Sequence, residues 1–253
     1  MTRAAEEPPR PLGGILFDYG ETLVEFSRPV AALAEAEHRI LEVLMASGQG
    51  APSPTTLRGV LDRVEREVAE YQRGGALEEM DPAAASLRAY TAAGVSIDTA
   101  LLDELLRIEQ EAWWHGARLD PEAIPLLDAL RGRGLRVGLC SNAPYRVASL
   151  HAQLAFVGLA GHLDSITFSA EVGWRKPSPH IFDAAMEALG TDAANTVMVG
   201  DSETADIAGA HAAGMRAVLL RRNGERGSGD ADAVIAALSE LTGALRNMGI
   251  YFV

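Results

Sequence analysis

The sequence predicts an α/β protein, with a Rossmann-like, doubly wound parallel sheet as its core and an inserted all-helical cap domain. Two observations lead to this fold class. Five short apolar runs, each bounded by glycine or a turn, have the length and composition of strands buried in a parallel sheet. Helical patterns separate these runs, and the stretch from residue 25 to residue 115 contains helical patterns alone.

The apolar runs are the expected strands of the sheet. The first, at 14–18, ends on an acid, Asp18. The other four strands are expected at 135–140, 165–168, 196–200 and 216–220. Helices are expected between them at 121–131 and 179–189, where apolar residues recur every three or four positions. Strands that alternate with helices favour parallel pairing with right-handed crossovers.

The stretch 25–115 is expected to be a domain of its own, a set of helices inserted after the first strand. Its clearest helix is 55–72, where apolar side chains fall on one face between Pro54 and the pair Gly74-Gly75. Further helices are expected around 33–44, from Asp81-Pro82 onward, and at 97–114. The expected division is a flexible tail at 1–11, a core at 12–24 and 116–246, and the helical insertion at 25–115.

Composition and charge narrow the class of function. A net charge of -13 argues against a nucleic-acid partner, because phosphate backbones bind basic surfaces. The chain has no apolar run that could span a bilayer, and its one cysteine, Cys140, fits a reducing compartment. Because the first residues are polar and rich in proline, no secretion signal is expected there. We therefore expect a cytoplasmic monomer or homodimer without a membrane partner. An acidic protein that binds a phosphorylated molecule needs local positive charge, which draws attention to Lys176, the only lysine.

Four polar signatures follow successive expected strands, and ligands bind at the carboxyl ends of such strands. The first runs from Phe17 to Leu23 and places Asp18 before a glycine turn, where a carboxylate can attack phosphorus or simply cap the turn. The second contains Ser141 and Asn142, which can hold phosphate oxygens or cap the next helix.

The third and fourth signatures add a cation and further acids. In Trp174-Arg175-Lys176-Pro177-Ser178-Pro179, the lysine can reach a phosphate, although most lysines are solvated. In the run from Gly200 to Asp206, Asp201 can hold magnesium, which prefers oxygen ligands, or cap a helix. Asp206 can orient the metal or a bound water.

In this order the four signatures resemble the haloacid dehalogenase superfamily, over nearly the whole chain from Ile15 to about Leu241. The most specific parts are the Lys-Pro-x-Pro-x-Ile-Phe run and the run from Gly200 to Asp206. The resemblance implies a Rossmann-like core and identifies the insertion as the family's helical cap. It also implies a magnesium-dependent hydrolase, a phosphatase that acts on a small phosphomonoester through an aspartyl-phosphate intermediate.

The resemblance assigns roles by position. Asp18 would be the nucleophile, Ser141 and Asn142 would hold the transferred phosphoryl group, and Lys176 would bridge nucleophile and phosphate. Magnesium would be held by four groups, which are the carboxylates of Asp18 and Asp201, the Gly20 carbonyl, and Asp206 in support. The metal and Lys176 would offset negative charge that otherwise repels the substrate.

The sequence departs from the family's phosphatases at Gly20, where they usually carry an aspartate that acts as general acid and base. Loss of such a group typically costs ~10² to 10⁴ in rate. Glu21, Glu109, Glu111 or His115 could replace it. Alternatively, the substrate could be an acyl or aryl phosphate that needs little protonation, or the site could bind phosphate with little turnover.

Two other functions stay open. A 2-haloacid dehalogenase also lacks the second aspartate, but retention of Asp201 favours phosphoryl chemistry. A non-catalytic phosphate-binding or scaffolding protein is the alternative from outside the enzymes. Phosphonate cleavage needs a lysine in the insertion, which contains none. Trp113-Trp114 is expected to pack the insertion on the core and could also line a pocket, and Arg221-Arg222 is expected to be a solvated loop.

Overall fold

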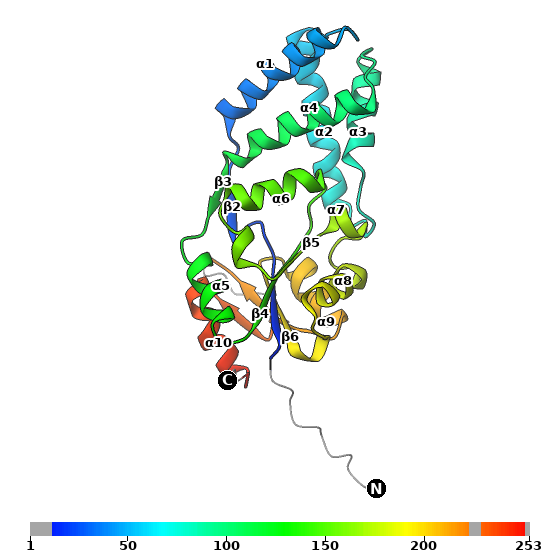
Figure 1. Ribbon diagram of the computed structural model, residues 1–253. Helices are drawn as coiled ribbons and strands as arrows, with labels where there is room; N and C mark the ends of the chain where they lie inside the picture. Colours follow the sequence, from blue (N-terminus) through cyan, green and yellow to red (C-terminus); the bar gives the residue numbers. More distant parts are fainter. Residues whose placement is uncertain (1–11, 223–228, 251–253) are drawn as a thin grey trace.

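The computed structural model describes residues 12–222 and 229–250, so the expected tail at 1–11 lies outside the described residues. Helices cover both faces of a central sheet, and a separate group of helices lies beyond one end of it (Figure 1). This is the predicted fold class. Every helix of the described residues is too short or too polar to cross a bilayer.

The sheet has six parallel strands in the order β5-β4-β1-β6-β7-β8. Their bounds are β1 Gly14–Phe17, β4 Arg136–Ser141, β5 Ser165–Phe168, β6 Thr196–Gly200, β7 Arg216–Leu220 and β8 Ala233–Ile235. The first strand is central, because Phe17 lies beside Leu139 of β4 and Val199 of β6. The residues that follow β1, β4 and β6 therefore meet at one edge of the sheet.

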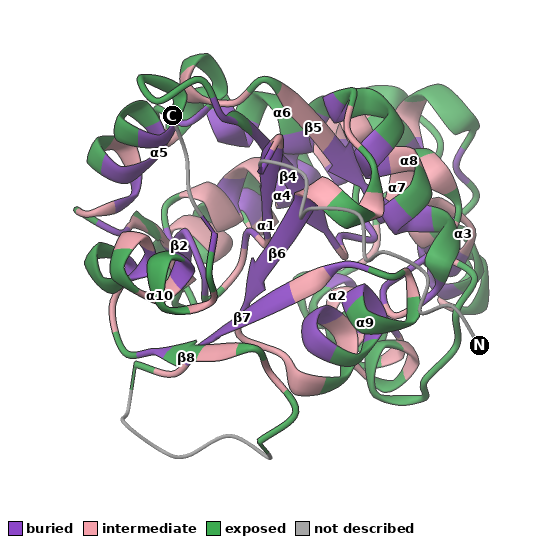
Figure 2. Cartoon of the chain, turned by 90° about the horizontal axis from the view of Figure 1, so that it is seen from below, coloured by how far each residue is buried: buried purple, intermediate pink, exposed green. Residues whose placement is uncertain are grey.

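Both faces of the sheet are buried, as its apolar strands predict. Side chains alternate along β1, where Ile15 and Phe17 join one apolar cluster and Leu16 joins another. Buried residues run through the centre of the molecule between helices (Figure 2). One face carries α5 Ala123–Arg131, α6 Val147–Phe156 and α10 Leu241–Asn247, and the other carries α8 Pro179–Leu189 and α9 Gly209–Ala212. A short α7 spans Ser169–Val172.

The inserted helices share an apolar cluster of their own. They are α1 Val30–Ser47, α2 Pro54–Arg73, α3 Pro82–Ala92 and α4 Thr99–Trp114. Two of them begin at the expected prolines, α2 at Pro54 and α3 at Pro82. The Ser53 side chain accepts a hydrogen bond from the Thr56 backbone at the start of α2, and Asp81 caps α3. The fourth helix begins at Thr99, two residues later than expected, because the Asp98 side chain caps it.

A two-stranded antiparallel sheet, which was not predicted from the sequence, carries the chain into and out of these helices. It pairs β2 Val24–Phe26 with β3 Ala117–Leu119, so the division expected between residues 24 and 25 falls inside β2. No residue bounds were predicted for helices α6 and α10, and the edge strand β8 was not predicted. Strands of three residues are too short to show a periodic pattern.

Candidate active site

The carboxyl edge of the sheet gathers the acidic and basic residues of the four signatures. Asp18 follows β1, Asp201 follows β6, and Ser141 ends β4. Lys176 lies in the loop before α8. We call the group formed by Asp18, Lys176, Asp201 and Asp206 the catalytic floor.

The lone lysine connects two of the acids. The Lys176 ammonium nitrogen lies 2.7 Å from Oδ1 of Asp18 and 2.5 Å from Oδ1 of Asp206, and its side chain is buried. Burial alone lowers the pKa of Lys176, but the carboxylates of Asp18 and Asp206 outweigh that effect and raise its pKa above the ordinary value. The lysine is therefore a permanent cation at the centre of the floor.

The three acids of the floor form a group that suits a hard cation. Each of Asp18, Asp201 and Asp206 offers a carboxylate oxygen, and these oxygens lie within 4.8 Å of one another. Burial, and then the charge of Asp18, raises the pKa of Asp201. One lysine cannot balance three adjacent carboxylates, and oxygen donors at this spacing are what magnesium prefers. The residues present fit the metal that the family implies.

Asp206 is the acid held most firmly. Its buried carboxylate accepts hydrogen bonds from Lys176 and, at 2.9 Å, from the Ser202 backbone. It projects from the π-helical turn Glu203–Ala208, and a side chain at Gly200 would meet it at 2.2 Å. Glycine at the end of β6 is thus required for the carboxylate to lie against the strand.

Ser141 and Asn142 lie beside the lysine. Ser141 is buried at the end of β4. The Asn142 side chain accepts a hydrogen bond from the Lys176 backbone nitrogen at 2.7 Å and donates one to the Lys176 carbonyl at 3.0 Å. The amide of Asn142 therefore holds the lysine loop in place.

Arg221 and Arg222 have structural partners, contrary to the expected solvated loop. The Arg221 guanidinium donates to the carbonyl of Asp201 and pairs with Glu203. The Arg222 guanidinium donates to the Thr22 carbonyl at 2.8 Å and lies 2.5 Å from an Asp120 carboxylate oxygen. The two arginines thus brace the loops that carry Asp201 and Asp18.

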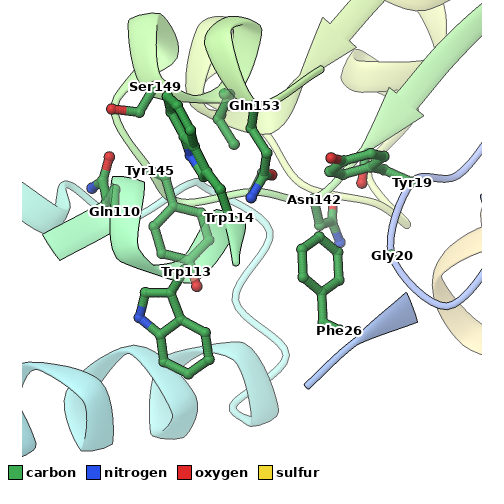
Figure 3. A pocket seen from close by; sticks show the side chains of 13 residues that line it. Tyr19, Gly20, Phe26, Gln110, Trp113, Trp114, Asn142, Tyr145, Ser149 and Gln153 are labelled. Carbon is green, nitrogen blue, oxygen red and sulfur yellow. The ribbon is translucent and has the colours of Figure 1, made fainter. Parts of the chain in front are cut away.

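A cavity of about 310 Å³ adjoins the catalytic floor (Figure 3). Gly20, Ser141 and Asn142 form the side of the cavity next to the floor. Half of the remaining lining residues are aromatic, with Trp113, Trp114 and Tyr145 on one side and Tyr19 and Phe26 on the other (Figure 3). We call this cavity the aromatic pocket.

The two tryptophans therefore do more than the packing expected of them. Both line the aromatic pocket, and Trp114 also packs against Phe156 of α6, with ring centroids 5.6 Å apart. Gln110 lies one helical turn before them on α4 and lines the same pocket. This spacing on one helix face could have linked the three residues from sequence. Tyr145 and Gln153 could not be placed, because no bounds were predicted for α6 or for the loop before it.

The candidates for the missing acid lie outside the aromatic pocket. Glu21 accepts a hydrogen bond from the Phe26 backbone, and Glu111 pairs with Arg107. His115 packs against Phe156, and Glu109 lines a separate cavity behind Trp113. None of these four is among the described residues that line the aromatic pocket.

The inserted helices also contact the core through a buried link that the sequence did not reveal. Glu79, in the segment between α2 and α3, accepts a hydrogen bond from Ser169, whose hydroxyl accepts one from the Ala143 backbone at 2.7 Å. The Glu79 carboxylate also lies 3.8 Å from the buried guanidinium of Arg175, the neighbour of Lys176. The insertion thereby contacts the Ser141 loop and the lysine loop together.

Acids and a lysine that converge at the carboxyl ends of parallel strands, beside a cavity, define an α/β enzyme of the open-sheet class. The chain belongs to the haloacid dehalogenase-like hydrolase family, whose model matches residues 12–214. The match includes all four signatures.

Phosphatases are among its relatives. The chain is 40% identical to the phosphoglycolate phosphatase of Rhodospirillum rubrum over 105 residues, which is 42% of each chain. It is also 40% identical to the phosphoserine phosphatase of Thermus thermophilus over 105 residues, 41% of each chain. The chain thus spans less than half the length of these two relatives.

Solved structures of two activities share the whole fold. A phosphatase of this superfamily from Thermococcus onnurineus matches with a TM-score of 0.62 at 25% identity, covering 96% of this chain and 100% of the other. A 2-haloacid dehalogenase from Pseudomonas syringae pv. tomato matches with a TM-score of 0.66 at 25% identity, covering 93% and 99%. The fold alone does not separate phosphatase from dehalogenase.

Proposed function

We propose that this chain is a magnesium-dependent phosphatase that hydrolyses a small phosphomonoester through an aspartyl-phosphate on Asp18. The observation that carries the proposal is the position of Lys176, which bridges Asp18 and Asp206 beside Asp201. The similarity to phosphatases over part of the chain supports the same reaction. The helices of 25–115 serve as its cap, which excludes water from the site.

The metal would be held by Asp18 and Asp201, with the Gly20 carbonyl as a further ligand. Asp206 supports the site, since both of its oxygens already accept hydrogen bonds. Bound magnesium supplies positive charge that offsets the charge of the phosphoryl oxygens.

The chain's own residues carry out the displacement. A carboxylate oxygen of Asp18 attacks phosphorus, and the bond from phosphorus to the ester oxygen breaks with its electron pair on the leaving group. Lys176 offsets charge on the nucleophile and the phosphoryl group, and Ser141 with the Asn142 backbone orients the phosphoryl oxygens. Water then cleaves the aspartyl-phosphate, which releases inorganic phosphate and restores Asp18.

Gly20 limits fast hydrolysis to substrates with weakly basic leaving groups. Without an aspartate at this position, an alcohol leaving group takes its proton from water. Acyl and aryl phosphates, which leave as weaker bases, are then hydrolysed faster than alkyl phosphates.

Phosphate release from acetyl phosphate, with and without magnesium, tests the proposal. We expect turnover that EDTA abolishes and magnesium restores, and that Asp18→Asn lowers by roughly 10⁴-fold or more. Asp183→Asn, a carboxylate of α8 outside the site, is the matched control. Turnover that survives EDTA or Asp18→Asn contradicts the mechanism.

A 2-haloacid dehalogenase is the second candidate, because such an enzyme shares the fold and Gly20 replaces the acid–base aspartate. In that reaction Asp18 would displace halide from carbon. Halide release from a 2-haloacid without phosphate release from acetyl phosphate would replace the phosphatase proposal with this one.

A further inference from the structure

The aromatic pocket contains no charged side chain among the described residues that line it. Its apolar surface comes from rings at both sides and from Leu150. The pocket begins beside the floor and extends to α4, so a group attached to a phosphate on Asp18 would enter it (Figure 3). The residues that line the pocket therefore contact the leaving group of the substrate.

The polar side chains of the pocket are neutral, and three of them are already hydrogen-bonded to other parts of the chain. Gln110 accepts a hydrogen bond from the Arg146 backbone, and Ser149 accepts one from the Arg146 guanidinium. Asn142 is bound to the lysine loop. The buried amide of Gln153 lines the pocket, and no hydrogen bond joins that amide to the part of the chain that is described.

Two arginines that contact lining residues of the pocket are paired with acids. The guanidinium of Arg28 lies 5.5 Å from the Trp113 ring centre, but Arg28 pairs with Glu65. Arg146 pairs with Asp103 through two hydrogen bonds of 2.6 Å. A charged leaving group would lose its hydration in the pocket without gaining an ion pair, which is unfavourable.

We infer that the substrate's leaving group is uncharged and carries an aromatic ring, which lies between Trp113 and Trp114 on one side and Tyr19 and Phe26 on the other. An apolar cavity of roughly 150 Å³ holds benzene, so a volume of about 310 Å³ accommodates a substituted ring. Ring faces and edges at several angles favour aromatic contacts. The inference rests on the proposed phosphatase function.

Benzyl phosphate and phosphoglycolate provide a direct test, because both release a primary alcohol and only phosphoglycolate carries a carboxylate there. We expect kcat/KM to be at least about tenfold higher for benzyl phosphate, a factor equal to roughly 1.4 kcal/mol. Acetyl phosphate serves as the internal reference, because its small leaving group makes few contacts in the pocket and its turnover therefore measures the reaction at the floor.

Two variants probe the pocket itself. Trp113→Ala should lower the ratio of kcat/KM for benzyl phosphate to that for acetyl phosphate about tenfold, mainly through KM, and Trp113→Phe should restore most of it. Gln153→Arg should raise kcat/KM for phosphoglycolate about tenfold relative to kcat/KM for benzyl phosphate, because the arginine supplies a cation that can pair with the carboxylate. Leu87→Ala, on the exposed face of α3, should leave both ratios unchanged.

The outcomes separate the inference from the proposed function. Magnesium-dependent turnover of acetyl phosphate with equal or better use of phosphoglycolate overturns the inference and leaves the phosphatase proposal standing. An unchanged ratio in a folded Trp113→Ala variant also overturns it. If none of the three phosphates is hydrolysed, both the inference and the phosphatase proposal are contradicted.

Discussion

The catalytic floor and the aromatic pocket lie side by side and differ in almost every physical respect. The floor consists of three carboxylates and one ammonium group. The Lys176 nitrogen lies 2.7 Å from an Asp18 oxygen and 2.5 Å from an Asp206 oxygen, and oxygens of all three acids lie within 4.8 Å of one another. The pocket consists mainly of rings and neutral polar groups, drawn from β2, α4, α6 and the segments at the ends of β1 and β4. One region supplies charge, and the other supplies apolar surface.

This difference teaches that reaction and selectivity are separable in this molecule. A change in the floor affects the step that every substrate shares, so it should alter kcat for all substrates alike. A change in the pocket affects only groups that reach it, so it should alter the ratio between substrates.

After Asp18→Asn, Lys176→Met should have the largest effect, since it removes the cation between Asp18 and Asp206. We expect kcat to fall about 10³-fold for acetyl and benzyl phosphate alike. The variant should also lose about 3–5 kcal/mol of stability, because two buried carboxylates lose their partner. Rates for both substrates are measured at a temperature at which the variant is folded. A change in the ratio of kcat for benzyl phosphate to kcat for acetyl phosphate would contradict the separation of floor and pocket.

Gly20→Asp should act in the opposite direction. Position 20 does not have a positive φ, and a side chain there would meet only the Phe26 ring at 3.6 Å, an ordinary contact. The new carboxyl group can serve as the general acid that the site lacks, so kcat for benzyl phosphate should rise about 10²-fold. Acetyl phosphate, which needs little protonation, should gain far less. Equal gains on both substrates would mean that Gly20 does not set the leaving-group requirement.

Gly200→Ala tests how tightly the floor is packed. An added Cβ would lie 2.2 Å from the Asp206 carboxylate, so we expect a loss of roughly 1–3 kcal/mol and about tenfold lower kcat. Gly59→Ala, in α2 with open space around it, is the matched control and should be stabilising by about 0.5–1 kcal/mol. Urea titrations of both variants measure this difference, and equal stabilities would contradict the close contact.

Glu109→Gln should have the smallest effect and should leave kcat unchanged. Burial, with a contribution from Glu65, raises the pKa of Glu109 from 4.5 to about 7. The folded state thus holds this proton more tightly than the unfolded state, so the stabilisation is complete below about pH 4.5 and is lost as the pH rises through 7. At pH 8 the variant should therefore melt about 2–4 °C higher than the wild type, and at pH 4.5 the two should match more closely. A fall in kcat would instead identify Glu109 as the missing acid.

The same contrast explains how much the sequence could predict. Residues of the floor follow strands, and parallel pairing brings strand ends together, so Asp18, Ser141 and Asp201 could be placed without coordinates. The pocket depends on how α4 packs against α6, and packing between distant elements leaves no local pattern. Glu79 illustrates the limit, since nothing around it in the chain indicates its contact with Ser169.

The most direct test of the central claim is to trap the phosphoenzyme. The protein is mixed with acetyl phosphate and magnesium, quenched in acid and analysed by mass spectrometry of its peptides. The account predicts one added phosphoryl group on the peptide that contains Asp18, and none in Asp18→Asn. Steady release of phosphate with an unmodified Asp18 peptide in rapidly quenched samples, or a phosphoryl group on another residue, would contradict it.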